Sequence, residues 1–371
     1  MDEQCRQRPE LVQSAKETVA GCTECGTCVR RCAFLTRYGM PRDIARRVLA
    51  GERTVDPFEC SLCNLCAAVC PEELAPGDLF LALRRLAADQ GLVDFKPYAP
   101  LLGYEKRGHS SLFAWYPPSP VKTVFFPGCT LPGTRPRITW KLFEALRKCE
   151  PEAAMVLDCC HKPSHDLGRQ PFFVEQFENI RNRLLALGVE RVVVACPNCH
   201  KVFRKYGEGL TVTTVYEVLA QYQTRMKREA VSASPRTTVQ VTVHDPCPLR
   251  NQAGVHQAVR SLLEARGFAI REMRDSRERT LCCGEGGAVG FKNPALAATW
   301  IEKRRAQAQG DLIVTYCAGC AGFLNRVAPT CHVGDVLFQP ERALAGKNMA
   351  TKPPFTYLNR LLLKHQLKRL S

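Results

Sequence analysis

The sequence predicts an α+β protein in which a helical N-terminal domain is followed by two homologous α/β domains. Three observations support this prediction. Residues 22–70 contain two dense runs of cysteine among helix-forming segments. Residues 121–345 alternate short apolar strands with helices, which is typical of α/β domains. Five cysteines of this second region recur at an almost constant spacing of 118 to 123 residues, which indicates an internal duplication.

Helical patterns surround the first cysteine region. The segment "PRDIARRVLAGE" has apolar residues at helical spacing, with Pro41 near its start and Gly51 near its end, and "GDLFLALRRLAADQG" follows the same pattern. A proline-rich segment, 95–120, is predicted to be a linker. The predicted domain limits are 1–94, 95–120, 121–232, 233–345 and a basic amphipathic tail at 346–371.

Short apolar runs that lead into helices define the two α/β domains. They are "KTVFFPGC", "RVVVACPNCHKVF", "VQVTVHDPC" and "DLIVTYCAGCAGFL". Each begins as a buried strand and ends at a cysteine, and this pattern is typical of strands in a parallel sheet.

The chain of 371 residues contains 21 cysteines. Because the chain is long, the count is odd, and "MDEQCRQRPELVQSAKETVA" lacks the apolar core of a signal peptide, we expect a cytoplasmic protein whose thiolates bind metal. No apolar run reaches the roughly 18 residues that a membrane-spanning helix needs. The formal charge of +16 counts every cysteine as neutral. No nucleic-acid motif accompanies it, so no nucleic acid is expected as a partner.

The first two cysteine runs both read C-x2-C-x2-C-x3-C, the spacing with which bacterial ferredoxins hold cubane [4Fe–4S] clusters. In such runs the fourth cysteine ligates the other cluster. One predicted ligand set is therefore Cys22, Cys25, Cys28 and Cys70. The other is Cys60, Cys63, Cys66 and Cys32. Zinc is the alternative metal, because it also takes paired C-x2-C elements.

The duplicated cysteines form a single cysteine, then an adjacent pair, then C-x-x-C. This pattern resembles the CCG domain, named for Cys-Cys-Gly, which occurs twice in the B and D subunits of heterodisulfide reductase. An N-terminal two-cluster ferredoxin-like domain fused to two CCG domains resembles the D subunit. The same layout occurs in iron–sulfur subunits of glycolate and lactate oxidases and of anaerobic glycerol-3-phosphate dehydrogenase.

The resemblance implies that each CCG motif binds a noncubane [4Fe–4S] cluster through five cysteines, and that a disulfide is cleaved between two facing clusters. The implied ligands of the first site are Cys129, Cys159, Cys160, Cys196 and Cys199. Those of the second site are Cys247, Cys282, Cys283, Cys317 and Cys320. Glycines after the second cysteine pair would admit a cluster and a substrate close to bare backbone.

One residue departs from the pattern: His161 stands where the first motif should have glycine. It is a candidate to donate a proton to a leaving thiolate, and the alternative is a hydrogen bond near the cluster. His200 and His244 adjoin expected ligands and are expected to donate hydrogen bonds that tune the cluster potential. Glu285 is a candidate proton relay by position, and a solvated surface role is equally compatible with the sequence. Cys5, Cys149 and Cys331 belong to neither pattern and are expected to be structural or incidental.

These patterns predict an iron–sulfur electron-transfer subunit of a heterodisulfide reductase-like complex, which reduces a disulfide. Because no GxGxxG fingerprint appears, no flavin or NAD is expected on this chain. Electrons would come from a flavoprotein or other electron-donor subunit. The alternative is a relay from a flavoprotein to the menaquinone pool, for which the basic tail could contact a membrane or a quinone-linked subunit. A third hypothesis is that the CCG sites hold structural zinc.

Overall fold

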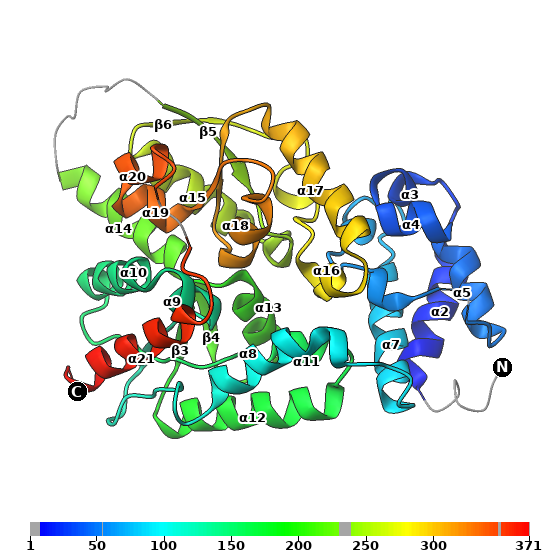
Figure 1. Cartoon of the computed structure of the whole chain (residues 1–371), viewed down its shortest axis with the longest axis horizontal. Helices are drawn as coiled ribbons and strands as arrows, with labels where there is room; N and C mark the ends of the chain where they lie inside the picture. The colour runs from blue at the N-terminus through cyan, green and yellow to red at the C-terminus, as the bar shows by residue number, and fades with distance from the viewer. Residues whose placement is uncertain (1–7, 54, 230–238, 348–349, 371) are drawn as a thin grey trace.

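The computed structural model describes residues 8–53, 55–229, 239–347 and 350–370. Its N-terminal region is entirely helical and lies at one end of the molecule, blue to cyan in Figure 1. Its elements are α2 (Pro9–Gly21), α3 (Thr27–Arg31), α4 (Ala33–Tyr38), α5 (Pro41–Leu49), η1 (Pro57–Glu59), α6 (Leu65–Ala68) and α7 (Pro76–Asp89). The two helices predicted from sequence are α5 and α7, and both begin with proline in the first turn.

The first α/β domain contains a four-stranded parallel sheet with strand order β2-β1-β3-β4. Its strands are β1 (Thr123–Phe126), β2 (Ala154–Met155), β3 (Arg191–Val194) and β4 (Thr211–Thr214). Its helices are α9 (Thr130–Thr134), α10 (Pro136–Cys149), α11 (Lys162–Asp166), α12 (Gln170–Ala186), α13 (Pro197–Tyr206) and α14 (Val215–Glu229).

The second α/β domain repeats this topology, with strand order β6-β5-β7-β8 and every pair parallel. Its strands are β5 (Val239–His244), β6 (Phe268–Arg271), β7 (Leu312–Thr315) and β8 (Thr330–His332). Its helical elements are η3 (Cys247–Leu249), α15 (Ala253–Glu264), η4 (Arg277–Arg279), η5 (Gly286–Ala288), α16 (Val289–Lys292), α17 (Pro294–Ala308), α18 (Ala318–Leu324), α19 (Val333–Phe338) and α20 (Pro340–Leu344). The repeated strand order confirms the predicted duplication and fold class.

The duplicated cysteines follow the carboxyl ends of three strands in each sheet. Cys129 and Cys196 follow β1 and β3, and Cys247 and Cys317 follow β5 and β7, while the adjacent pairs come after β2 and β6. In open parallel sheets, ligands bind outside the carboxyl ends where the strand order reverses, which here is between β1 and β3 and between β5 and β7. The topology therefore gathers each five-cysteine set at one sheet edge.

The two α/β domains share one hydrophobic core, so they form a single packed body. Tyr216 and Tyr316 meet edge to face across the boundary, with ring centroids 5.8 Å apart, and both belong to this core. A buried ion pair joins Arg135 to Asp335 at 2.8 Å. The predicted boundary at 232/233 lies outside the described residues, so the domain limits themselves stay predictions.

The buried guanidinium of Arg84, on α7, joins the N-terminal region to both α/β domains. It donates hydrogen bonds to four backbone carbonyls: Pro57 at 2.9 Å, Cys60 at 2.5 Å, Asp166 at 2.7 Å and Gly287 at 2.8 Å. Burial of this cation lowers its pKa, and the hydrogen bonds compensate for its lost hydration. The relative position of the three domains is thus fixed by polar contacts as well as by apolar packing.

The segment predicted as a linker, 95–120, is more than a spacer. It contains η2 (Lys96–Tyr98) and α8 (Ala99–His109), which packs beside α11. Pro100 occupies the first turn of α8, where its missing N–H removes no hydrogen bond. The proline content therefore marks a helix start here, and α8 contributes side chains to the cavity described below.

The basic tail forms α21 (Phe355–Lys368), which packs against α9 and α10 of the first α/β domain. Asn359 donates a hydrogen bond to the carbonyl of Gly133 at 2.8 Å, and Arg360 donates one to Gly108 at 2.9 Å. Phe355, Leu358 and Leu362 stay exposed on the opposite face. The helix is amphipathic as predicted, but its buried face also carries a cation.

Gly168 lies where α7 and the first α/β domain approach each other closely. It has φ +78°, and a Cβ added there would collide with the backbone carbonyl of Arg84. Gly188 has a similar φ of +74° with open space around it. We expect Gly188→Ala to lower the free energy of unfolding by about 1 kcal/mol, the cost of left-handed backbone. Gly168→Ala should cost about 3 kcal/mol or more, because overpacking adds to that strain.

Denaturant unfolding of both variants at equal iron content measures this difference. Equal destabilisation by the two substitutions would contradict the close packing at Gly168.

Candidate metal centres

The first ferredoxin-like set gathers near the protein surface. Cys22, Cys25, Cys28 and Cys70 line one small hollow, and Cys25 is exposed. Burial, together with the nearby thiols of Cys22 and Cys70, raises the pKa of Cys28. The structure therefore brings the fourth cysteine of the second run to the first run, as the predicted crossed assignment requires. The role of these residues as ligands stays a prediction.

The second ferredoxin-like set lies deeper in the protein. Cys60, Cys63 and Cys66 are buried, and Cys32 of the first run joins them. Burial raises the pKa of Cys66 well above its usual value, and the thiols of Cys60, Cys63 and Cys32 raise it further. Four thiols this close cannot ionise together unless a cation offsets their charge.

The two runs share one backbone shape. Glu24 and Leu62 each stand two residues after the first cysteine of their run, and both have positive φ, 57° and 51°. Gly26 and Asn64 each stand two residues before the third cysteine and are also left-handed, with φ of 71° and 56°. Each run therefore curls twice within six residues, which lets three sulfurs point toward one centre.

Nine of the ten duplicated cysteines line one cavity between the two α/β domains, with a volume of about 250 Å³. These nine are Cys129, Cys159, Cys160, Cys196, Cys199, Cys247, Cys283, Cys317 and Cys320. Two sets that the sequence separates by more than a hundred residues thus face the same volume.

The thiol contacts within the two sets are duplicated as well. Cys129 contacts Cys159 as Cys247 contacts Cys282. The C-x-x-C cysteines contact each other and the second cysteine of the adjacent pair. In the first domain these contacts join Cys199 to Cys160 and Cys196, and in the second they join Cys320 to Cys283 and Cys317. The sulfurs of Cys283 and Cys320 are 3.0 Å apart.

Cys282 is the tenth cysteine, and it contacts the N-terminal domain. Its thiol lies against that of Cys63 as well as that of Cys247. Arg250 fixes this junction by donating to the carbonyl of Cys63 at 3.1 Å and to that of Thr280 at 2.9 Å. The deeper ferredoxin-like set and the second five-cysteine set therefore meet at two sulfurs.

The donor sets fit iron–sulfur clusters chemically. Each consists of mutually close thiols, which become stable thiolates when metal is bound, and most thiols of the other three sets are buried, unlike those of the surface set. Gly128 keeps the backbone open beside the first CCG-type set, because a Cβ there would lie 2.9 Å from the Cβ of Cys196 and 3.2 Å from the sulfur of Cys199.

A buried cation accompanies the second five-cysteine set. Arg304 buries Nε and Nη2 with no hydrogen-bond partner among the described residues. Burial lowers the pKa of Arg304 to about 10, while the charges of Asp245, Asp275, Cys283 and Cys320 oppose this shift. The arginine is therefore placed to offset part of the negative charge that thiolates would bring to this site.

His161 lies beside this cavity but does not line it. Its side chain is fully buried, with the ring near His109 and Phe172 and with Nδ1 3.6 Å from the Glu105 carboxylate. Its φ of +55° matches the left-handed conformation of Gly284, its counterpart in the second motif. Histidine thus occupies a glycine position of the duplicated turn, and its catalytic role stays a prediction.

Glu285 does line the cavity, where its carboxylate lies within 4.8 Å of the sulfurs of Cys317 and Cys320. Burial raises the pKa of Glu285 to about 7, and the charges of nearby cysteines add to this effect, while Lys162 opposes it. Glu285 is half-buried on the cavity wall, and its role as a proton relay stays a prediction.

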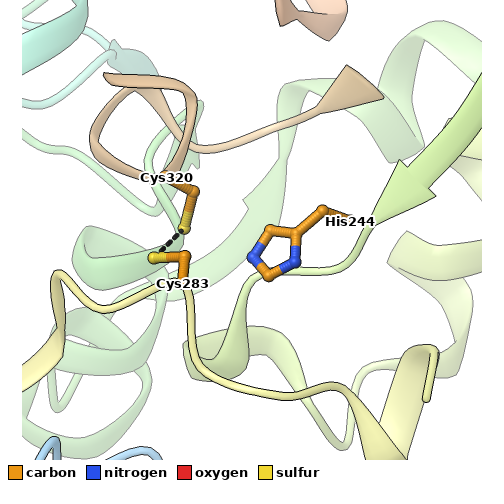
Figure 2. A group of neighbouring side chains, drawn as sticks. All are labelled: His244, Cys283 and Cys320. Atoms are coloured by element: carbon orange, nitrogen blue, oxygen red, sulfur yellow. Dashed lines mark hydrogen bonds between the residues drawn. The ribbon is translucent and has the colours of Figure 1, made fainter. Parts of the chain in front are cut away.

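His244 stands at the end of β5 with its imidazole facing Cys283 and Cys320 (Figure 2). Burial lowers its pKa well below the usual value, so the ring is neutral. His200, beside Cys199, is also buried, and burial lowers its pKa to about 4. Neither ring can serve as a cation here.

Sequence patterns held no signal for several residues at the sites. Tyr104 and Glu105, from the supposed linker, line the cavity. Arg360, from the tail helix, lies near Cys129 and favours its thiolate. None of these belongs to a cysteine motif, and only the packing of α8 and α21 brings them there.

The leftover cysteines lie apart from the clusters. Cys331 is buried in β8, and the thiol of Cys149 donates to the carbonyl of Ala145 within α10. Cys5 lies outside the described residues. Within the described part of the chain, every helix is too short or too polar to cross a membrane.

Comparisons with known proteins match this architecture. The family described as "Cysteine-rich domain" (CCG) matches residues 123–204 and 241–325. The family described as "4Fe-4S dicluster domain" matches residues 18–74. The two CCG matches coincide with the two parallel sheets, and the third match covers both ferredoxin-like runs.

Similar proteins extend over most of the chain. The B subunit of fumarate reductase (CoM/CoB) from Methanothermobacter marburgensis is 26% identical over 368 residues, which cover 89% of this chain and 72% of that protein. The D subunit of dihydromethanophenazine:CoB–CoM heterodisulfide reductase from Methanosarcina mazei is 27% identical over 357 residues, which cover 81% and 86%. EtfAB:quinone oxidoreductase of Syntrophomonas wolfei is 26% identical over 180 residues, which cover 44% and 24%.

These matches confirm the resemblance on which the cluster assignment was based. The dicluster match covers the two ferredoxin-like cysteine sets, and the two CCG matches cover the cysteines of the shared cavity. The chain is an iron–sulfur protein in which a 4Fe-4S dicluster domain precedes two CCG domains, and over most of its length it is similar to the D subunits of heterodisulfide reductase.

Proposed function

We propose that this chain is the iron–sulfur electron-transfer subunit of a heterodisulfide reductase-like redox complex and that it reduces a disulfide in the cavity between its CCG domains. The observation that carries the proposal is the convergence of nine duplicated cysteines on one cavity. Two structural zinc sites would need no shared open space between them. A disulfide cleaved between two facing centres does need one.

The proposed cofactors are two cubane [4Fe–4S] clusters on the ferredoxin-like sets and two noncubane [4Fe–4S] clusters on the CCG sets. When bound, these groups would supply single-electron transfer through the N-terminal domain and paired electrons at the cavity. Cleaving R–S–S–R′ to two thiols consumes two electrons and two protons.

The cysteines of the dicluster domain form a path from the protein surface to this cavity. Cys25 is exposed, Cys66 is buried between the two ferredoxin-like sets, and Cys63 contacts Cys282 of the second CCG set. The arrangement supports electron entry at the Cys25 side, where a partner can dock, and delivery at the Cys282 side. Arg84 and Arg250 hold the backbone of this path in place.

The cavity wall also determines what can happen to a bound disulfide. Its ionisable side chains other than cysteine are Tyr104, Glu105, Lys162, Asp166 and Glu285. Leu101, Phe291 and Phe323 supply apolar surface that excludes water. Protons for the two product thiols would have to come through this mixed wall.

The relatives are subunits of multisubunit enzymes, which implies partner subunits for this chain. We propose a flavoprotein or other electron-donor subunit as the partner of the Cys25 side, in a cytoplasmic complex. The similarity to an EtfAB:quinone oxidoreductase supports a second candidate function, a relay from a flavoprotein to a quinone. In that case the exposed apolar face of α21 would be the membrane-facing or quinone-subunit-facing surface.

Iron and acid-labile sulfide per chain, measured on protein purified without oxygen, test the cofactor proposal. Four clusters of four irons predict about sixteen of each per chain. About eight of each would mean that only the dicluster domain is loaded. That result would contradict disulfide reduction at the CCG sites and favour the zinc hypothesis.

Substitution of single cysteines tests the second CCG set. Cys282→Ala should lower the iron content by about four atoms per chain and remove the noncubane signal from electron paramagnetic resonance spectra, because it removes one ligand of that cluster. Cys331→Ala is the matched control, since it removes an equally buried thiol outside the cavity. It should leave both readouts unchanged.

The assignment would be wrong if Cys282→Ala retained full iron. Loss of iron from every site in Cys282→Ala but not in Cys331→Ala would instead show that the Cys63–Cys282 junction supports the dicluster domain.

A further inference from the structure

We infer that His244 is an iron ligand of the second CCG site, where it adds a nitrogen donor to Cys283 and Cys320. This inference rests on the proposed function, because it takes a cluster to be bound there. It goes beyond that proposal, since five cysteines alone were assigned to each site. It also makes the two facing sites chemically different.

The geometry places the imidazole at ligand distance from two thiols. A ring nitrogen of His244 and the sulfurs of Cys283 and Cys320 all lie within 4.8 Å of one another, and all three side chains are buried (Figure 2). Metal–sulfur and metal–nitrogen bonds are about 2.0–2.3 Å long, so donors of one metal ion lie about 3–4.5 Å apart. A small decrease in the distances among these three donor atoms would bring them to the separation of ligands on one metal ion.

The two ring nitrogens of His244 are buried without a hydrogen-bond partner among the described residues. The side chain is 0% exposed. A buried polar atom without a partner costs about 1–3 kcal/mol, so such atoms are rare in folded proteins. A bound metal satisfies one nitrogen of the ring directly.

The first CCG domain shows that the fold itself does not need histidine here. Phe126 ends β1 where His244 ends β5, in the same position relative to the neighbouring central strand. Phe126 packs on Phe203 with ring centroids 5.0 Å apart, in one apolar cluster with Cys160 and Cys199. An apolar ring therefore fills this position well, and histidine adds only polar function.

The presence of Arg304 supports a role for His244 as a metal ligand rather than as a hydrogen-bond donor to the thiolates. The buried Nε and Nη2 of Arg304 lack partners among the described residues, and the charges of Cys283 and Cys320 favour its protonated form. The guanidinium can supply N–H donors to thiolate sulfur, but it has no lone pair to offer a metal. His244 is the neighbouring side chain that has one.

The consequence is an inequality between the two clusters. His244 would join the five cysteines and replace none of them, so the second site keeps its thiolate charge and gains a nitrogen donor that the first site lacks. It is also the site whose Cys282 contacts Cys63 of the dicluster domain.

Nitrogen hyperfine spectroscopy tests the inference on the full chain, purified without oxygen and poised so that the noncubane clusters are paramagnetic. Protein labelled with 15N only in histidine should show a nitrogen coupling of the size found for imidazole bonded to iron. His244→Phe, which copies the first domain, should abolish this coupling and keep the iron content. His200→Phe is the control and should preserve the coupling.

The outcomes separate the inference from the proposed function. Full iron content with only the weak coupling of a hydrogen bond, or with none, would overturn histidine ligation and leave the CCG clusters standing. Iron sufficient for the dicluster domain alone would overturn both. If His244→Phe fails to fold, comparing 15N-histidine with natural-abundance protein still decides the matter in the unmodified sequence.

Discussion

The buried Arg84 guanidinium is the interaction on which the arrangement of the three domains depends. It donates to carbonyls of Pro57 and Cys60 in the dicluster domain, of Asp166 in the first CCG domain and of Gly287 in the second. A cation buried this fully is tolerated only because several carbonyl dipoles surround it. The loops that carry the deeper ferredoxin-like cysteines and the two CCG motifs are thereby held together at one point.

Duplication accounts for most of the cysteines that line the cavity, and differences between the two copies distinguish its two walls. Two parallel sheets of equivalent strand order direct their carboxyl ends to one cavity, so two five-cysteine sets share one volume. The two copies differ in their contact with the dicluster domain and in the residue that ends the first strand of each sheet. Cys282 contacts the dicluster domain, and His244 stands where the first copy has Phe126. A symmetric scaffold thus carries an asymmetric pair of centres.

Cysteine spacing made the sites predictable, because cluster ligands must recur at fixed intervals along a tight loop. The spacing predicted that Cys70 joins the first run and Cys32 the second, and the structure brings these cysteines close to those runs. It could not reveal α8, whose prolines were interpreted as a linker, because helix starts and linkers share that composition. Nor could it place Arg360 or Arg304, because tertiary packing of distant helices alone brings these cations to the thiols.

The central claim is that both CCG sets hold iron on opposite walls of one cavity. A crystal grown without oxygen, with anomalous scattering recorded at the iron absorption edge, tests it most directly. The account predicts iron at the two ferredoxin-like sets and at both walls of the cavity, one beside Cys160 and Cys199 and one beside Cys283, Cys320 and His244. Iron confined to the dicluster domain, with zinc or no metal at the CCG cysteines, would contradict it.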